Sequence, residues 1–560
     1  MEGRTSIYEQ DGLAGPDRPG DLDGKAGSVR TDDLNGQSGP DRPGGLDGPG
    51  DPARADGRTA VLLPADRRPT NSQIINGAAL FFSVAFFISA FAAALYTGEW
   101  GSVFHSWYLI MISPCPLVTD YLAVGGLSAA MLNAGACGMV CFLFMAGLKG
   151  ESHANTLAGY FLVVAHCFYG LNFLNMWPCF LAPFLYLRLN KLDLKRNLQV
   201  CMFATSFAPF ISEFLFRYTQ RGSFVFGQLS LTPSGILLAI AFSILLGFVV
   251  PAILPGAQVW HKGYDLYNGG LAFGLFGFFV YNFMYKTMGI RSMGPIYHNN
   301  VIYNQHGHSY KLYAVCFFSA VFLCCLAAGY LLNGKSLKGY RKLLRDTGHN
   351  SDFTERYGMP LCLINIGFYG LLFLAYLVVV ITFTQGAGFT GPTMGVMLAS
   401  LTFTAMGQHP KNVWPIVLGY QVLYFVTAFF CHVNGRAITW SITTQGYING
   451  VAFATGLAPI VGRYGIRAGL LSGFMCASMC TATSALHGGF VLYNGGFTAG
   501  ITALILIPIL EHYIPAVREE INYQDISVQN MIALISNTGK DPEKQEIGRL
   551  FLRSSKEKNG

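Results

Sequence analysis

Long apolar runs separated by short polar loops fill most of the chain after residue 70. Most of these runs are close to the roughly 20 residues that a helix needs to cross a bilayer core of about 30 Å. Two shorter apolar pieces, 104–113 and 177–190, are too short to span comfortably, and we expect them to be re-entrant or tilted. The runs lie at about 74–97, 121–147, 155–176, 198–216, 233–255, 265–286, 311–333, 359–383, 388–406, 412–431, 445–463, 467–485 and 493–515. The pattern predicts an all-α integral membrane protein with about 13 or 14 transmembrane helices.

Composition supports the same class. Of the 560 residues, 52% are hydrophobic and 12% are charged, about half the charged fraction of a typical soluble domain. A single soluble core could not bury a dozen such runs. The net charge of +7 comes from basic residues that collect in particular loops, above all 335–358, which favours a topology signal over nucleic-acid binding. The expected partner is therefore the lipid bilayer, and an oligomer is left open.

The basic loops also suggest an orientation. Placing the loop at 334–358 in the cytoplasm makes the following loops alternate, and it puts the C-terminal tail, residues 516–560, inside the cell. The N-terminus is expected on the same side, with 14 crossings. This loop then divides a first transmembrane half, 71–333, from a second, 359–515. Residues 1–70 carry a Gly/Pro/Asp-rich tandem repeat that cannot bury enough apolar surface, and we expect a disordered tail there.

Two sequence motifs occur twice in the same order. FATSFAP at 203–209 matches FATGLAP at 453–459, and HKGYDLYNGGLAFG at 261–274 matches HGGFVLYNGGFTAG at 487–500. We interpret them as an internal duplication, with an insertion in the first copy around 217–234. On the topology above, matching helices cross the membrane in opposite directions. The sequence therefore predicts two inverted structural repeats, an arrangement common in secondary transporters.

The LYNGG segments are the candidate binding site. Each glycine weakens a helix by about 1 kcal/mol relative to alanine, and inside a membrane such a break is tolerated only against protein or a watery cavity. A helix starting there would direct free N–H groups at a bound anion or carbonyl. The alternative is that both are turns at the membrane surface, with glycines for close helix packing. The candidates are Tyr267, Asn268, Gly269 and Gly270 in the first copy and Tyr493, Asn494, Gly495 and Gly496 in the second.

Polar residues at depth extend this site, because ionisable groups inside membrane spans are costly and usually functional. We add Asp120, Asn133 and the repeat-matched pair His261 and His487. A further candidate, Asp265, has a valine as its counterpart in the second copy, at position 491. His166 stands alone in an apolar run and is expected to be a hydrogen-bonded core residue.

We expect no metal site, no cofactor and no enzymatic activity. The thirteen cysteines lie almost wholly in apolar runs, without histidines or carboxylates at zinc-binding spacing. The sequence has no HExxH, GxSxG or phosphate-binding Gly-Lys-Ser/Thr motif. The missing phosphate-binding loop also argues against an ATP-driven pump in this chain.

The run SPCPLVTDYLAVGGLSAAMLNAG at 113–135, with the two LYNGG copies, resembles an uncharacterised family of bacterial multi-pass membrane proteins. That resemblance covers roughly 71–514; it implies a bacterial plasma-membrane protein and no substrate. YNGGLAFG and YNGGFTAG also look like the YNG-x-L-x-G helix element of urea channels, which are likewise duplicated and inverted, although the Leu-Pro-x-x-Thr-x-Pro-Phe signature of those channels is absent.

Together these features predict a secondary transporter of a small solute, with the site between two inverted repeats and access alternating by rocking of the halves. A coupling ion is compatible with this mechanism. One alternative is a passive channel for a small, neutral, urea-like solute. Another is a membrane-embedded enzyme or an assembly scaffold, and a scaffold would leave the LYNGG segments dry and tightly packed.

Overall fold

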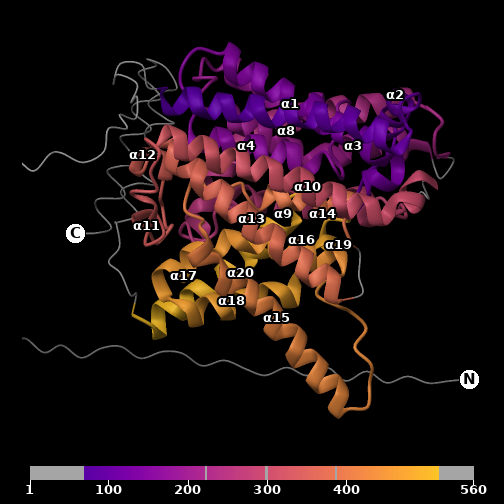
Figure 1. Ribbon diagram of the computed structural model, residues 1–560. Coiled ribbons are helices and arrows are strands. Elements are labelled where there is room, and N and C mark those ends of the chain that lie inside the picture. The colour runs from indigo at the N-terminus through magenta and orange to yellow at the C-terminus, as the bar shows by residue number, and fades with distance from the viewer. Residues whose placement is uncertain (1–68, 221–223, 297–300, 385–387, 516–560) are drawn as a thin grey trace, which may run out of the picture. The chain divides into compact units, whose positions relative to one another are not determined.

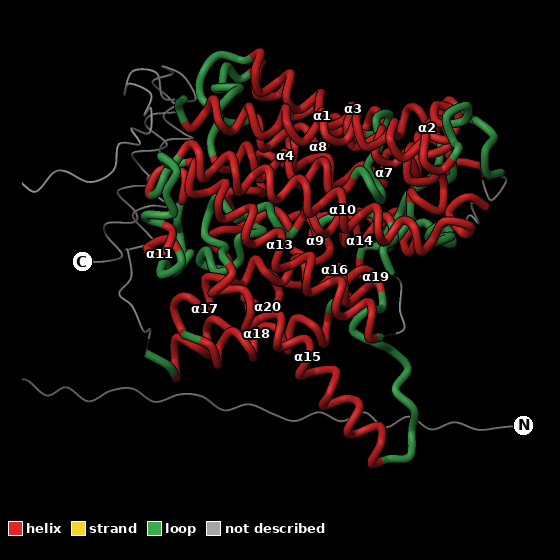
Figure 2. Tube along the Cα trace, viewed as in Figure 1, coloured by secondary structure: helices red, strands yellow, loops and turns green. Residues whose placement is uncertain are grey.

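The computed structural model describes residues 69–220, 224–296, 301–384 and 388–515. The predicted tails therefore lie outside the described residues, except for positions 69 and 70. Within the described part the chain forms helices joined by loops, without a strand (Figure 2). This confirms the all-α fold class.

The first copy of the duplicated unit runs from α1 to the π-helical turn η4 (Figure 1). Its elements are α1 (Asn71–Thr97), α2 (Val103–Met111), α3 (Tyr121–Gly147), α4 (Ala154–His166), α5 (Met176–Leu189), α6 (Leu198–Ala204), η2 (Thr205–Phe207), α7 (Ala208–Phe216), η3 (Tyr218–Gln220), α8 (Pro233–Trp260), α9 (Asn268–Tyr281) and η4 (Asn282–Thr287).

The second copy follows in the same order. Its elements are α10 (Val301–Leu332), α11 (Tyr340–Leu343), α12 (Phe353–Arg356), α13 (Met359–Phe383), α14 (Gly391–Ala399), α15 (Pro410–Val433), α16 (Gln445–Ala454), η5 (Thr455–Leu457), α17 (Ala458–Tyr464), α18 (Ile466–Met479), α19 (Thr483–Leu486) and α20 (Asn494–Tyr513).

Equivalent helices pack on equivalent neighbours. The pairs α1–α3, α5–α8 and α8–α9 in the first copy correspond to α10–α13, α15–α18 and α18–α20 in the second. Across the interface, α4 packs on α14 and α9 on α20, so matching helices meet each other. Helix α10 thus belongs with the second copy, whereas the sequence placed the 311–333 run at the end of the first half. The basic loop after α10 marks a charge boundary, not the boundary of the repeat.

The two copies are inverted. Helix α1 begins next to the basic loop, where the Asn71 side chain donates to the Thr354 carbonyl at 2.8 Å and accepts from the Met359 N–H at 2.9 Å. Its counterpart α10 instead ends at that loop, because residues 334–358 follow it directly. In the same way α9 leads away from Lys262, whereas α20 ends beside it in an ion pair between Lys262 and Glu511.

The basic loops that the sequence placed on one side of the membrane lie at one end of the described bundle. The Ser152 N–H donates to Ser72 Oγ at the start of α1 at 2.8 Å, and Lys195 packs against Gly150. At the same end, the last turn of α17 packs against the basic loop through Gly462 and Thr347. The grouping agrees with the topology argument, while the membrane side that this end faces stays a prediction.

Eight helices in the described ranges are long and apolar enough to cross a membrane. The sequence suggested about 13 or 14 spans, and the difference arises because several apolar runs form half-length helices. The run at 155–176 ends its helix at His166, and the short piece at 177–190 forms α5, which returns towards the end from which α4 starts. Isolated half-helices could not satisfy their backbone groups in lipid, so they must be buried against protein.

The turn after α4 and the matching turn after α14 are each fixed by one buried asparagine. The Asn133 side chain donates to the carbonyls of Cys167 and Leu171 at 2.8 and 2.9 Å. The Asn365 side chain donates to the carbonyls of Thr404 and Gln408, both at 2.8 Å. Each asparagine is completely buried, and each thereby supplies partners for backbone groups that water cannot reach.

Candidate functional site

The two LYNGG segments meet at the centre of the interface between the copies. A Cβ placed on Gly270 would lie 2.6 Å from the Gly496 Cα, so only glycine permits this approach. One turn further on, a Cβ on Gly274 would lie 2.7 Å from the Phe497 Cβ, and a Cβ on Gly500 would lie 2.7 Å from the Leu271 Cβ. These contacts are reciprocal between equivalent positions. The crossing therefore has a local two-fold axis, like the interface of a symmetric dimer.

Reciprocal contacts continue to the helix breaks at FATSFAP and FATGLAP. The Leu266 N–H donates to the Gly456 carbonyl and the Leu492 N–H to the Ser206 carbonyl, both at 2.9 Å. The breaks η2 and η5 are single 3₁₀ turns before a proline at the start of the next helix. Because proline has no N–H to donate, the preceding turn is released from regular helix bonding. Each LYNGG segment thus rests on a helix break of the other copy.

Aromatic rings from both copies surround the crossing. The Tyr267 ring lies 5.1 Å from the Phe453 ring, and its counterpart Tyr493 lies 6.4 Å from the Phe203 ring. The His166 ring lies 5.2 Å from Tyr493. As expected, His166 is a hydrogen-bonded core residue, with its ring nitrogens 2.6 and 3.2 Å from the carbonyl oxygens of Leu162 and Leu492.

A small pocket of ≈ 30 Å³ opens at this crossing. Its lining includes the first turn of α9, from Asn268 to Gly270, and no charged side chain. The remaining lining residues are Asn155, Leu162, Phe203, Leu266, Tyr267, Phe403 and Tyr493. A pocket of this size holds about one or two water molecules. Phe203 and Tyr267 come from the duplicated motifs, whereas Asn155, Leu162 and Phe403 carried no recognisable signal in the sequence.

Several polar atoms around the crossing are buried without a hydrogen-bond partner. They include the Asn268 Oδ1 and the hydroxyl of Tyr493, both of which belong to pocket-lining residues. The hydroxyl of Tyr169 is also unpaired, and its ring lies 5.1 Å from His166. Buried polar groups are normally paired, and an unpaired one costs about 1–3 kcal/mol.

Two sequence candidates lie away from the pocket. Asp120 caps the start of α3, where its Oδ1 accepts from the Leu122 N–H and from the Gly391 N–H at the start of α14, both at 2.9 Å. Asn133 has its full set of partners, because its Oδ1 also accepts from Trp107 Nε1 and the Phe173 N–H at 3.2 and 3.1 Å. Asp120 links the two copies, and Asn133 holds the turn between α4 and α5.

The histidines at the start of the repeated motif cap helices. His261 follows α8 and His487 follows α19, and both are buried. In the structure His487 and Val491 are completely buried, because the segment packs against α9 at Gly277. The LYNGG segments are therefore buried within the protein, while their depth in the membrane stays a prediction.

The basic loop packs against the segment that leads into the first LYNGG segment. The His349 ring lies 4.4 Å from the Tyr264 ring, and its Nε2 is 2.9 Å from the Lys262 carbonyl oxygen. The Phe353 N–H donates to the Ala405 carbonyl at 2.9 Å. The loop therefore ties the segment before α9 to the turn between α14 and α15.

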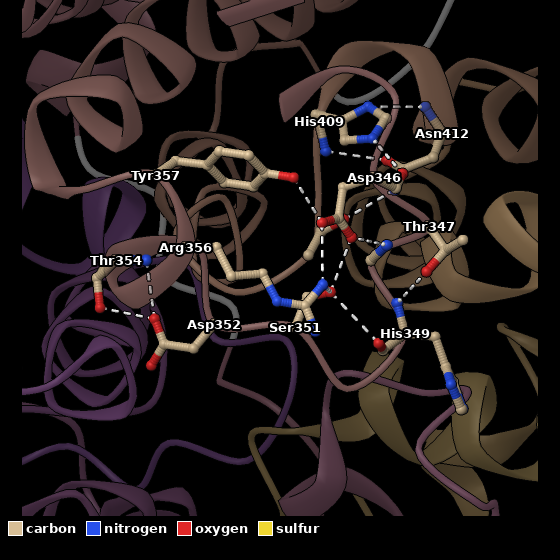
Figure 3. Close-up of polar contacts among 12 residues, drawn as sticks. Asp346, Thr347, His349, Ser351, Asp352, Thr354, Arg356, Tyr357, His409 and Asn412 are labelled. Atoms are coloured by element: carbon tan, nitrogen blue, oxygen red, sulfur yellow. Dashed lines mark hydrogen bonds and ion pairs between the residues drawn. The ribbon is translucent and has the colours of Figure 1, made fainter. Parts of the chain in front are cut away.

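Asp346 organises this loop. Its carboxylate accepts from the Gly348 N–H at 2.9 Å, from Ser351 Oγ at 2.8 Å and from the Tyr357 hydroxyl at 2.7 Å, and it pairs with Arg356 at 3.1 Å (Figure 3). Burial raises the pKa of Asp346, but these hydrogen bonds and the Arg356 charge together outweigh it and lower the pKa below its usual value. The loop is thus held by an ionised carboxylate.

At the opposite end, a buried ion pair at the C-terminal end of α7 accepts a hydrogen bond from η4. Glu213 and Arg217 are 2.7 Å apart and almost completely buried, and the Tyr285 hydroxyl donates to Glu213 at 2.6 Å. Glu213 and Arg463 occupy matching positions in the duplicated sequence. The inverted arrangement predicted no direct pair between them, and Glu213 indeed pairs within its own copy.

These features define a class: a multi-pass, membrane-type helical protein built from two inverted copies, with a small uncharged pocket where two matching helix starts meet. The family of proteins of unknown function designated DUF1576 matches residues 100–286 and again 332–512. The chain belongs to this family. The matched ranges start 232 residues apart, as Asn133 and Asn365 do, and they end 226 residues apart, as Asn268 and Asn494 do. The family match therefore follows the duplication seen in the packing.

No curated protein and no solved structure matches the chain.

Proposed function

We propose that the protein is a secondary transporter that moves a small polar solute across a membrane. The observation that carries this proposal is the reciprocal crossing of α9 and α20 at a small pocket. Two helix starts meet between inverted copies, which is where carriers built from inverted repeats bind their solutes. The free N–H groups of a first helical turn favour a carbonyl or an anion, and the uncharged lining favours a solute without a net positive charge.

The size of the pocket supports a carrier over an open channel. At ≈ 30 Å³ the pocket accommodates water but not a solute of several heavy atoms, so transport needs the copies to move apart. The 3₁₀ breaks η2 and η5 lie under the two LYNGG segments and supply natural hinges. We propose that rocking about this interface opens the pocket to each side in turn. The cell membrane is the proposed location, with the basic end in the cytoplasm.

A passive channel for a small neutral solute is the second candidate, because no charged side chain lines the pocket. A scaffold is less well supported. Tight packing at Gly270 and Gly496 would suit it, but a scaffold gives no reason for the unpaired buried atoms of Asn268 and Tyr493. An enzymatic role has no support from any cluster of catalytic side chains at the pocket.

The proposal is tested with purified protein in liposomes. Uptake of radiolabelled urea, glycerol, acetate and alanine is measured with and without a pH gradient, in wild type and in Asn268→Leu/Asn494→Leu. The control is Asn434→Leu, which changes an exposed residue at the end of α15. We expect at least one solute to enter faster than through protein-free liposomes, and the double substitution to abolish that excess while the control retains it. Flux that survives the double substitution would exclude the pocket as the site.

Carrier and channel are separated by conformational measurements. Spin labels at the exposed ends of α9 and α20 are expected to report two distance populations, because the copies must separate alternately at each end. A single population under all conditions, together with no flux of any of the four solutes, would refute transport by this protein. Flux with a single population would favour the channel.

A further inference from the structure

The two copies of the repeated motif differ in one hydrogen bond. In the second copy the Val491 N–H donates to His487 Nδ1 at 3.3 Å, so the ring proton is on Nε2, which donates to Asn494 Oδ1 at 3.0 Å. In the first copy the Asp265 N–H likewise approaches His261 Nδ1, at 3.4 Å. There, however, neither His261 Nε2 nor Asn268 Oδ1 has a partner. The bond that closes the second copy is absent from the first.

The first copy also carries a buried carboxyl group that the second lacks. Asp265 is completely buried, its Oδ1 accepts from the Tyr267 N–H at 2.9 Å, and its Oδ2 has no partner. The counterpart, Val491, is apolar. None of the three ion pairs between described residues involves Asp265. Desolvating a carboxylate without a cation costs far more than desolvating the neutral acid, so the group must be protonated or meet a cation.

The groups around Asp265 provide no permanent positive charge. The nearest titratable neighbours are His261, with His349 beyond it, Tyr267, and Cys476 of α18. On the elements packed against this segment, Tyr264 contacts Tyr464 at 3.4 Å, Lys262 pairs with Glu511, and none of the ion pairs between described residues joins Arg463 of α17 to Asp265. Within the described ranges there is no group of three or more metal-ligating side chains. A metal ion needs several such side chains as ligands, whereas a single carboxyl group is enough to bind a proton.

We propose that Asp265 is a proton-binding site, occupied in the closed state seen here and released when the first copy opens. Three unpaired polar atoms, on His261, Asp265 and Asn268, fall within one eight-residue segment, while their counterparts are paired or apolar. Opening would hydrate this segment and allow the carboxyl group to ionise. If the protein is the transporter proposed above, the proton is its coupling ion, and the two LYNGG segments differ because one carries the proton.

The test uses full-length protein in lipid and needs no solute. Infrared spectra recorded across neutral pH report the C=O stretch of protonated carboxyl groups. We expect a band that is lost in Asp265→Asn and also in Asp265→Val, which copies the residue of the second copy. Asp120→Asn, which changes the carboxyl group at the start of α3, is the matched control and should retain the band. The valine variant removes the unpaired Oδ2 but also the acceptor of the Tyr267 N–H, so the folding of each variant is checked by its melting curve.

The outcomes separate this inference from the transport proposal. An identical band in wild type and in both Asp265 variants would overturn it. The inference would also be overturned if Na⁺, compared with K⁺, raised the melting temperature of wild type but not of Asp265→Asn. The bound cation would then be a sodium ion, not a proton. If any of the four solutes moves, a pH gradient should drive wild type and should lose its effect in Asp265→Val. A lost band without any solute flux would support the proton site and count against transport.

Discussion

Adding one methyl group to the crossing of α9 and α20 should distinguish two glycines that the sequence presents as equivalent. In Gly270→Ala the new Cβ would lie 2.6 Å from the Gly496 Cα, about 0.8 Å closer than ordinary contact, and the neighbour is backbone. In Gly496→Ala the nearest atom is the Tyr267 Cβ at 2.9 Å, followed by the Gly270 Cα at 3.2 Å. The first substitution must separate the two helices, whereas the second needs only a small shift.

The magnitudes follow from two opposing effects. Overpacking a close contact costs about 1–3 kcal/mol, while alanine in a helix is favoured over glycine by about 1 kcal/mol. We therefore expect Gly270→Ala to lose about 2 kcal/mol of stability, at the upper end of the overpacking range. Gly496→Ala should change it by less than about 1 kcal/mol. Gly77→Ala in α1, where no atom lies within 4 Å, should be neutral or stabilising.

Thermal unfolding in detergent, followed by tryptophan fluorescence, gives the order of the three variants. We expect the melting temperature to fall most for Gly270→Ala and to stay at or above that of wild type for Gly77→Ala. Equal losses for Gly270→Ala and Gly496→Ala would contradict the asymmetry of the contact. An unchanged Gly270→Ala would show that the helices do not touch there.

Three further outcomes are expected. Asp346→Asn should destabilise the protein near neutral pH. Because the folded-state pKa of Asp346 is lowered, the stability that its carboxylate contributes is fully present above the unfolded pKa of about 3.9 and is lost as the pH falls through the folded pKa. The melting temperatures of variant and wild type should therefore converge below about pH 4. Glu213→Gln leaves the Arg217 charge buried without its carboxylate and should lower the free energy of unfolding by about 3–5 kcal/mol. Glu511→Gln breaks an exposed pair and should lower it by less than about 1 kcal/mol in the same assay. Asn494→Leu removes the acceptor of the His487 ring N–H and should lower the free energy of unfolding by about 1–3 kcal/mol. Asn268→Leu should lower it by less, because the Asn268 Oδ1 has no partner to lose. Equal losses in the two variants would contradict the difference between the copies.

The helical membrane class, the duplication and the inverted order could be predicted from the sequence, because each depends on local properties. Apolar run length follows from the thickness of the bilayer, and repeated motifs such as LYNGG are visible without knowing what they contact. The basic loops likewise grouped correctly at one end, since charge placement reflects topology rather than packing. His166 was correctly assigned to the core from its isolation in an apolar run.

Only the tertiary structure decided which residues form the pocket and which serve the framework. Asn133 and Asn268 are both asparagines in apolar surroundings, yet one has all its partners and the other has an unpaired oxygen. The reduction of 13 or 14 runs to eight long helices also depended on tertiary contacts, because a half-length helix is stable only where another part of the chain satisfies its ends. Local sequence fixes how long a helix can be, whereas the partners of a buried polar group lie hundreds of residues away and are set by the way the two copies pack.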